Sequence, residues 1–129
     1  MSFCHDQPWC DLTMSCASWD HNEQYDLLFK PSDDEPLHPV KFYLSPYEER
    51  SYLVTHPYAS PIFAELDHLP PLLIQCGEAE VLHDEICLLA HKASQTGTTF
   101  VRHEVYEGSY LIITCSPFIS NICHYSINC

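Results

Sequence analysis

One stretch, Leu69–Tyr106, restricts the fold more than any other part of this sequence. Its apolar run Leu72–Cys76 follows two prolines and is typical of a buried parallel strand. Apolar residues then recur at helical spacing over Leu82–Gln95, and Gly97 follows where a helix commonly ends. The β-branched and aromatic run Thr99–Tyr106 predicts a second strand. Two strands joined by one helix predict a parallel βαβ unit, and therefore an α/β fold.

Acidic side chains crowd the turn between the first of these strands and the helix. Glu78 and Glu80 come directly after Gly77, which ends the strand. Asp84 and Glu85 stand at the predicted start of the helix, where the helix dipole favours carboxylates. Ligands of parallel sheets bind beyond the carboxyl ends of the strands. The positions of Glu78 and Glu80 therefore predict a site at this edge of the sheet.

The overall composition excludes several kinds of partner. With 129 residues the chain has the length of one domain, and its 18 Asp and Glu residues outnumber its 5 Lys and Arg residues. No basic patch can neutralise phosphates, so nucleic acid is not expected as a partner and anionic membranes are disfavoured. Three glycines are few for a phosphate-binding or oxyanion loop. No signal peptide and no transmembrane segment is predicted, and the cellular compartment and oligomeric state stay open.

Eight cysteines raise the question of a zinc site or a set of disulfides. Their spacing opposes zinc, because Cys4, Cys10 and Cys16 are six residues apart and no Cys-x-x-Cys pair occurs. Cys76 and Cys87 fall in the apolar strand and helix, where a thiol behaves as a small hydrophobic group. The sequence therefore predicts no metal site and no cofactor.

The segments that flank the βαβ unit differ from it and from each other. Pro8–Thr13 indicates the end of a strand that enters a loop, with Asp11 or Thr13 capping a local turn. Prolines predict an irregular connection over Lys30–Pro39 and an ordered loop over Thr55–Pro61, and one short helix is expected within Val40–Leu53. Gly108–Cys129 contains no Asp, Glu, Lys or Arg, carries three of the eight cysteines and shows no clear strand alternation. This tail is predicted to lie outside the domain.

The chain resembles the C-terminal part of α/β-hydrolases of the hormone-sensitive lipase and arylacetamide deacetylase group, with fungal steryl acetyl hydrolase-like esterases as the nearest resemblance. The matching stretches keep their order over residues 8 to 107 and include Pro8–Thr13, Ser18-Trp19, Asp34–Pro39, Thr55–Pro61, Leu69–Gln75, Gly77, Glu80–Leu82, Asp84-Glu85 and His103–Glu107. The resemblance implies an incomplete sheet, built from a parallel βαβ unit and irregular cap-side segments.

The resemblance also implies a chemistry, carried by a Ser, Asp or Glu, and His triad in that chain order. The family's acid follows the penultimate strand, which assigns it to Glu80, with Glu78 and Asp84 as alternatives. The nucleophile string Gly-Asp-Ser-Ala-Gly and the oxyanion string His-Gly-Gly-Gly do not occur in this sequence. Leu111 stands where the family has its catalytic histidine, and neither His103 nor His124 matches that motif.

Two interpretations of function follow from the resemblance. The first is hydrolysis of small lipophilic acetyl or acyl esters by the full-length family, with this chain inactive alone because nucleophile, oxyanion loop and general base are missing. The second is a non-catalytic truncated paralogue or binding fragment. Residues 1–107 are predicted to form the C-terminal part of the hydrolase domain. Residues 108–129 are predicted to be an uncharged, non-family tail, and the hypothesis for its origin is a translated intron or an alternative splice product.

Overall fold

The computed structural model describes residues 3–6, 8–26, 40, 43–44, 53–108 and 124–126. Within them it contains four strands, two α-helices and one 3₁₀ helix. In chain order these are β1 (Phe3–Asp6), α1 (Ser18–His21), η2 (Pro61–Phe63), β2 (Leu72–Gly77), α4 (His83–Gln95), β3 (Val101–Tyr106) and β4 (His124–Ser126).

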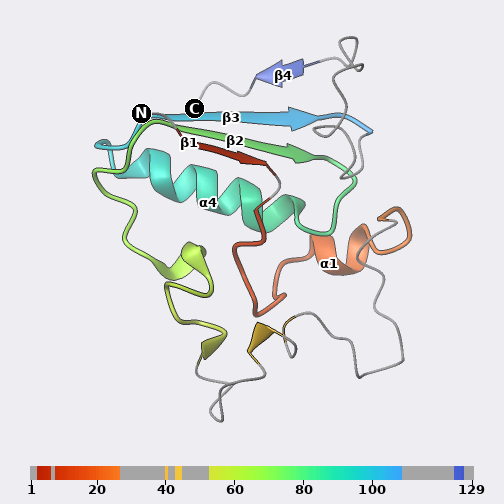
Figure 1. Ribbon diagram of the computed structural model, residues 1–129. Helices are drawn as coiled ribbons and strands as arrows, with labels where there is room; N and C mark the ends of the chain where they lie inside the picture. The colour runs from red at the N-terminus through yellow and green to blue at the C-terminus, as the bar shows by residue number, and fades with distance from the viewer. Residues whose placement is uncertain are drawn as a thin grey trace.

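The sheet has the strand order β1-β2-β3-β4. Strands β1, β2 and β3 are parallel, and Leu72 lies opposite Val101 at the start of the β2–β3 pairing. Figure 1 shows α4 running back along one face of the sheet, opposite in direction to the strands it connects. This arrangement confirms the predicted βαβ unit and α/β fold. The second strand begins at Val101, two residues after the predicted start.

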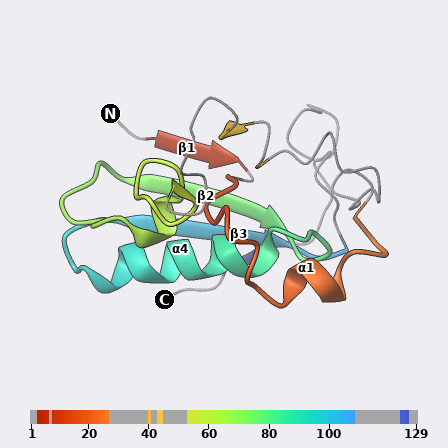
Figure 2. The same cartoon turned by 90° about the horizontal axis from the view of Figure 1, so that it is seen from below.

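The core lies between α4 and the sheet, and both elements present apolar side chains to it. On β2, Leu72, Ile74 and Cys76 alternate with less buried residues, as expected when one face of a strand is covered. The apolar stripe of α4 packs onto them, and Figure 2 shows the helix lying along the sheet. The most buried residues of this cluster are Cys10, Ile74, Cys76, Val81, Leu82, Ile86 and Ala93.

The two ends of α4 follow the predicted signals. Asp84 and Glu85 lie in its first turn, where carboxylates complement the helix dipole. At the other end the chain leaves the helix through Thr96 and Gly97, and the positive φ of 68° at Gly97 is a backbone conformation that glycine adopts without a steric penalty.

The described parts of the flanking segments pack against the core and the sheet. Cys10 is fully buried and Ser18 is 3% exposed. Strands pair with β2 on both sides, and Ile74 is 1% exposed. No strand was expected in the tail, whereas β4 pairs antiparallel with β3.

Among the described residues, no helix has both the length and the apolar character that crossing a bilayer requires. The prediction that residues 108–129 lie outside the domain stays a prediction, and the tail except 108 and 124–126 falls outside the described residues.

Candidate active-site segment

The acidic turn, defined here as Glu78–Leu82, lies where β2 and β3 end side by side. The backbone N–H of Glu78 donates to the carbonyl of Tyr106 at 3.0 Å, which ties the start of the turn to the last residue of β3. Figure 1 shows the turn at the carboxyl ends of the parallel strands. This is the edge at which ligands of such sheets bind.

Glu80 is the buried carboxylate of this turn. Glu80 is only 1% exposed. Glu78, two residues earlier, is exposed. The carbonyl of Glu80 accepts from the backbone N–H of His83 at 3.2 Å, which leads the chain into α4. The turn therefore separates the two glutamates by environment, although the sequence presents them alike.

Side chains of residues 22 and 26 hold the acidic turn in place from outside. The Asn22 Nδ2 amide donates to the carbonyls of Glu78 and Glu80 at 3.1 and 2.8 Å. The backbone N–H of Val81 donates to the Asp26 carboxylate at 3.1 Å. These contacts satisfy backbone groups that the turn leaves without secondary-structure partners. The turn is thus fixed by the segment that follows β1, and not by its own sequence alone.

The start of α4 is joined to the same segment through Asp84. The Asp84 carboxylate accepts from the backbone N–H of Ser18 at 2.8 Å, and the Ser18 hydroxyl lies 3.2 Å from the backbone N–H of Asp84. The Ser18 hydroxyl also donates to the carbonyl of Val81 at 2.6 Å. These bonds join the start of α1 to the start of α4.

Glu85 is fully buried and accepts three hydrogen bonds from the Cys10–Trp19 region. Its Oε1 accepts from the backbone N–H groups of Cys10 and Asp11 at 2.8 and 3.0 Å, and its Oε2 accepts from the Trp19 indole at 3.1 Å. Burial raises the pKa of Glu85, and these three donors oppose that rise. The sequence assigned Glu85 only to the helix dipole and missed this contact, because its partners lie far away along the chain.

A group of sulfur and nitrogen atoms lies behind the acidic turn, between β2 and α4. The side-chain ligand atoms of Cys76, His83 and Cys87 all lie within 4.8 Å of one another. Cys87 Sγ is 3.5 Å from His83 Nε2, and Cys76 Sγ is 3.5 Å from Nε2 of His103 on β3. Cys76 and Cys87 were predicted to be core thiols, and they do pack in or against the core. Their approach to two imidazoles was not predicted.

The opposite face of the sheet carries a polar network that spans β2 and β3. The Gln75 amide donates to Glu104 Oε2 and to the Tyr106 hydroxyl, each at 2.7 Å, and that hydroxyl donates to Glu104 Oε2 at 2.9 Å. Arg102 forms an ion pair with the same carboxylate. Burial raises the pKa of Glu104, but the bonds from Gln75, Tyr106 and Arg102 outweigh it and hold that pKa below its usual value.

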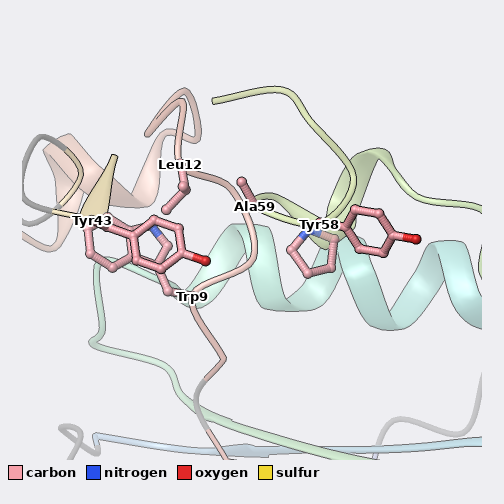
Figure 3. A pocket seen from close by; sticks show the side chains of 6 residues that line it. Trp9, Leu12, Tyr43, Tyr58 and Ala59 are labelled. Atoms are coloured by element: carbon pink, nitrogen blue, oxygen red, sulfur yellow. The ribbon is translucent and has the colours of Figure 1, made fainter. Parts of the chain in front are cut away.

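An apolar cavity of about 450 Å³ lies beside the segment that follows β1 (Figure 3). It is lined by Trp9, Leu12, Tyr43, Tyr58, Ala59 and Pro61. None of these residues belongs to the acidic turn, and none carries a carboxylate, thiol or imidazole. Trp9 also packs against Trp19 with ring centroids 5.8 Å apart, which connects the cavity wall to the buried Glu85 contact.

The predicted turn cap at Asp11 is present, since its Oδ1 accepts from the backbone N–H of Thr13 at 2.9 Å. His103 lies within β3, as the sequence indicated. Leu111, the position at which the family's histidine was expected, lies outside the described residues.

Comparison with known proteins agrees with this geometry. The family model described as alpha/beta hydrolase fold matches residues 5–111. An acetyl-hydrolase of Streptomyces hygroscopicus is 37% identical over 91 residues, which are 70% of this chain and 28% of the relative. An esterase of Acinetobacter venetianus is 32% identical over 103 residues, which are 80% of this chain and 32% of the relative. The chain therefore spans about a third of the length of the curated relatives that it matches.

Solved structures show the same relationship in three dimensions. The EstE5 crystal structure soaked in ethyl alcohol superposes with a TM-score of 0.68 at 32% identity, covering 84% of this chain and 34% of EstE5. A hormone-sensitive lipase from a metagenome library superposes with a TM-score of 0.68 at 28% identity, covering 82% of this chain and 34% of the lipase. Fold, family match and neighbours agree, and the chain belongs to the α/β-hydrolase family, in the group similar to hormone-sensitive lipase.

Proposed function

We propose that this chain carries the acid-bearing segment of a serine-dependent carboxylic ester hydrolase, with Glu80 as the acid. One observation supports this above the others: Glu80 is a buried carboxylate on a turn held by hydrogen bonds at the common carboxyl edge of β2 and β3. Glu78 is exposed, and Asp84 is bound to Ser18. Both alternatives are therefore less suited than Glu80 to hold a histidine.

The role of Glu80 in such a reaction would be to act on the histidine. A serine hydroxyl attacks the ester carbonyl carbon while the histidine removes the hydroxyl proton, and the same histidine then protonates the departing alcohol. The acid accepts a hydrogen bond from the other ring nitrogen, which orients the imidazole and stabilises its charged form. Water later hydrolyses the acyl-enzyme by the same proton transfers.

The substrates proposed for the complete enzyme are small lipophilic acetyl or acyl esters. The relatives support this class, because one is named an acetyl-hydrolase and the other an esterase. The sequence of this chain contains neither the nucleophile string nor the oxyanion string, and it has Leu111 in place of the histidine. We therefore expect no turnover by this chain alone, and a purely non-catalytic fragment is the alternative.

A hybrid enzyme tests the assignment of Glu80. In it, the matched 91 residues of the Streptomyces acetyl-hydrolase are replaced by those of this chain, while the relative's own nucleophile and terminal histidine are kept. We expect hydrolysis of p-nitrophenyl acetate by the hybrid, and a loss of about 100-fold or more in kcat on Glu80→Gln, because the histidine loses its orienting charge.

Glu78→Gln is the matched control and should retain turnover, since that side chain is exposed. Loss of turnover with Asp84→Asn, combined with near-normal Glu80→Gln, would move the acid role to Asp84. The chain by itself should neither hydrolyse the ester nor label with a fluorophosphonate. Stoichiometric labelling that one serine-to-alanine change abolishes would refute its inactivity.

A further inference from the structure

Two cysteines and two histidines meet between α4 and the sheet, and they come from three elements. Cys76 is the penultimate residue of β2, and His103 lies on the adjacent strand β3. His83 and Cys87 stand four residues apart on α4, so they lie one above the other on the same helix face. The fold thus brings together residues whose sequence separations match no common metal-binding motif.

The ligand atoms of Cys76, His83 and Cys87 are close enough to share one ion, and His103 Nε2 lies beside Cys76 Sγ. Zinc binds thiolate sulfur at about 2.3 Å and imidazole nitrogen at about 2.0–2.1 Å, so a tetrahedral ion holds its sulfur and nitrogen ligands about 3.6 Å apart. The two sulfur–nitrogen pairs, Cys87 with His83 and Cys76 with His103, are each separated by 3.5 Å. The ligand atoms of Cys76, His83 and Cys87 lie within 4.8 Å of one another, which leaves space for one ion between them.

A second feature that is typical of metal sites is the orientation of His83. Its Nδ1 lies 3.1 Å from Asp84 Oδ1, so Nε2 is the nitrogen that faces Cys87. Histidines that bind metals commonly donate their other ring N–H to a carboxylate, which fixes the tautomer and makes the ligand more basic. Asp84 is itself held by the backbone N–H of Ser18 at 2.8 Å. The imidazole is therefore oriented before any ion binds.

The members of the group differ in their exposure to solvent. Cys76 is 1% exposed, while the His83 side chain is 25% exposed and offers a route for an ion from solvent.

We propose that Cys76, His83 and Cys87 form a binding site for a thiophilic divalent cation of the zinc type, with His103 as the fourth ligand. Binding of the ion displaces the thiol protons, and the two resulting thiolates balance its charge. The site joins β2, α4 and β3 next to the acidic turn, so its first effect is on the stability of this part of the fold. It is independent of ester hydrolysis.

Cobalt(II) titration of the reduced chain tests the site, because tetrahedral cobalt bound to thiolate gives intense visible bands and a sulfur-to-cobalt charge-transfer band. The titration uses a background in which Cys4, Cys16, Cys115, Cys123 and Cys129 are replaced by serine, which removes competing thiols. We expect one Co²⁺ per chain with both signatures, competition by Zn²⁺, and a higher Tm in the presence of either ion.

Ligand variants then define the site. Cys87→Ser and His83→Gln should each weaken the affinity for Co²⁺ by about 100-fold or more, since loss of a residue that only orients a ligand already costs 10- to 100-fold. Asp84→Asn should cause a loss within that smaller range. The matched control is Cys10→Ser, which alters a buried thiol outside the group and should leave the affinity unchanged.

Two results would overturn the proposal. One is the absence of saturable Co²⁺ binding by the folded, reduced chain. The other is binding of undiminished affinity in the Cys87→Ser chain. If a variant fails to fold, X-ray absorption of the metal-loaded wild-type chain decides the question, because it must show two sulfur ligands.

Discussion

Glu85 connects parts of the chain that lie 75 residues apart, and it does so through one carboxylate. Its two oxygens accept from Cys10 N–H, Asp11 N–H and the Trp19 indole in a fully buried position. A buried donor that loses its acceptor costs about 1–3 kcal/mol. The three bonds together therefore anchor the segment after β1 onto α4, and they support the acidic turn indirectly.

Replacing Glu85 by alanine should destabilise the chain by about 3 kcal/mol or more, because three buried donors lose their acceptor at once. The measurement is the urea midpoint of unfolding followed by circular dichroism. The exposed Glu78→Ala provides the control and should shift the midpoint little. An unchanged midpoint for Glu85→Ala would show that the segment before residue 26 does not depend on this contact.

Single residues were predictable where their partners are local. The Asp11 turn cap and the conformation of Gly97 involve neighbours within a few positions, so sequence signals found them. The Glu85 contact and the Cys76–His83–Cys87 group depend on which residues the fold brings together from distant positions. The spacing of residues along the chain does not indicate which of them come close in the fold. For the same reason, the cysteine spacing argued against a metal site, although Cys76 and Cys87 lie close together.

At the scale of elements, β2 and β3 are joined by side chains as well as by their ladder. Gln75 and Tyr106 both bond the Glu104 carboxylate on the face of the sheet away from α4, and Arg102 adds a charge. These partners hold the pKa of Glu104 below its ordinary value of 4.5. The ionised carboxylate therefore stabilises the folded chain at pH values above 4.5. This stabilisation is lost as the pH falls through the lower pKa of the folded state.

Replacing Glu104 by glutamine should consequently make the stability of the chain less sensitive to acid. When the pH falls from neutral to below 4.5, the Tm of the wild-type chain should decrease more than the Tm of the Glu104→Gln chain. The two Tm values should become similar at the low pH. Thermal melts at a series of pH values measure this. The exposed Glu107→Gln serves as the control. A constant Tm difference at all pH values would contradict a role for the Glu104 charge.

Helices and strands with a regular pattern of apolar residues could be predicted from the sequence, and those without such a pattern could not. The apolar run of β2 and the stripe of α4 gave their bounds to within one or two residues, because burial against a single core imposes a regular pattern. Strand β4 has only three residues, and its pairing with β3 depends on tertiary proximity. Its sequence, His124-Tyr125-Ser126, contains no alternation long enough to indicate a strand.

For the whole molecule, the question is whether the tail belongs to the domain. The family match reaches residue 111, and the sequence loses all charged residues from Gly108 onward. Yet β4 pairs through Glu104 with Ser126, Val105 with Tyr125 and Tyr106 with His124. Such pairing covers the outer edge of β3, which would otherwise expose backbone donors and acceptors. Strand β4 therefore protects an edge of the sheet, and whether the tail contributes to the core is a separate question.

Truncation of the chain after Glu107 separates these two roles. If the tail lies outside the domain, the truncated chain should still fold, and amide exchange should change only at the edge that β4 covers. Protection of amides within Glu104–Tyr106 should fall by roughly tenfold, the equivalent of about one net hydrogen bond, while amides of α4 keep theirs.

Hydrogen exchange followed by mass spectrometry or NMR measures both regions in one experiment. Among the residues that the structure describes, α4 packs against β2, β3 and other residues before 107, so its protection reports on the core itself. Equal loss of protection in α4 and β3 would show that residues 108–129 are an integral part of the domain, and the division at residue 107 would then be wrong.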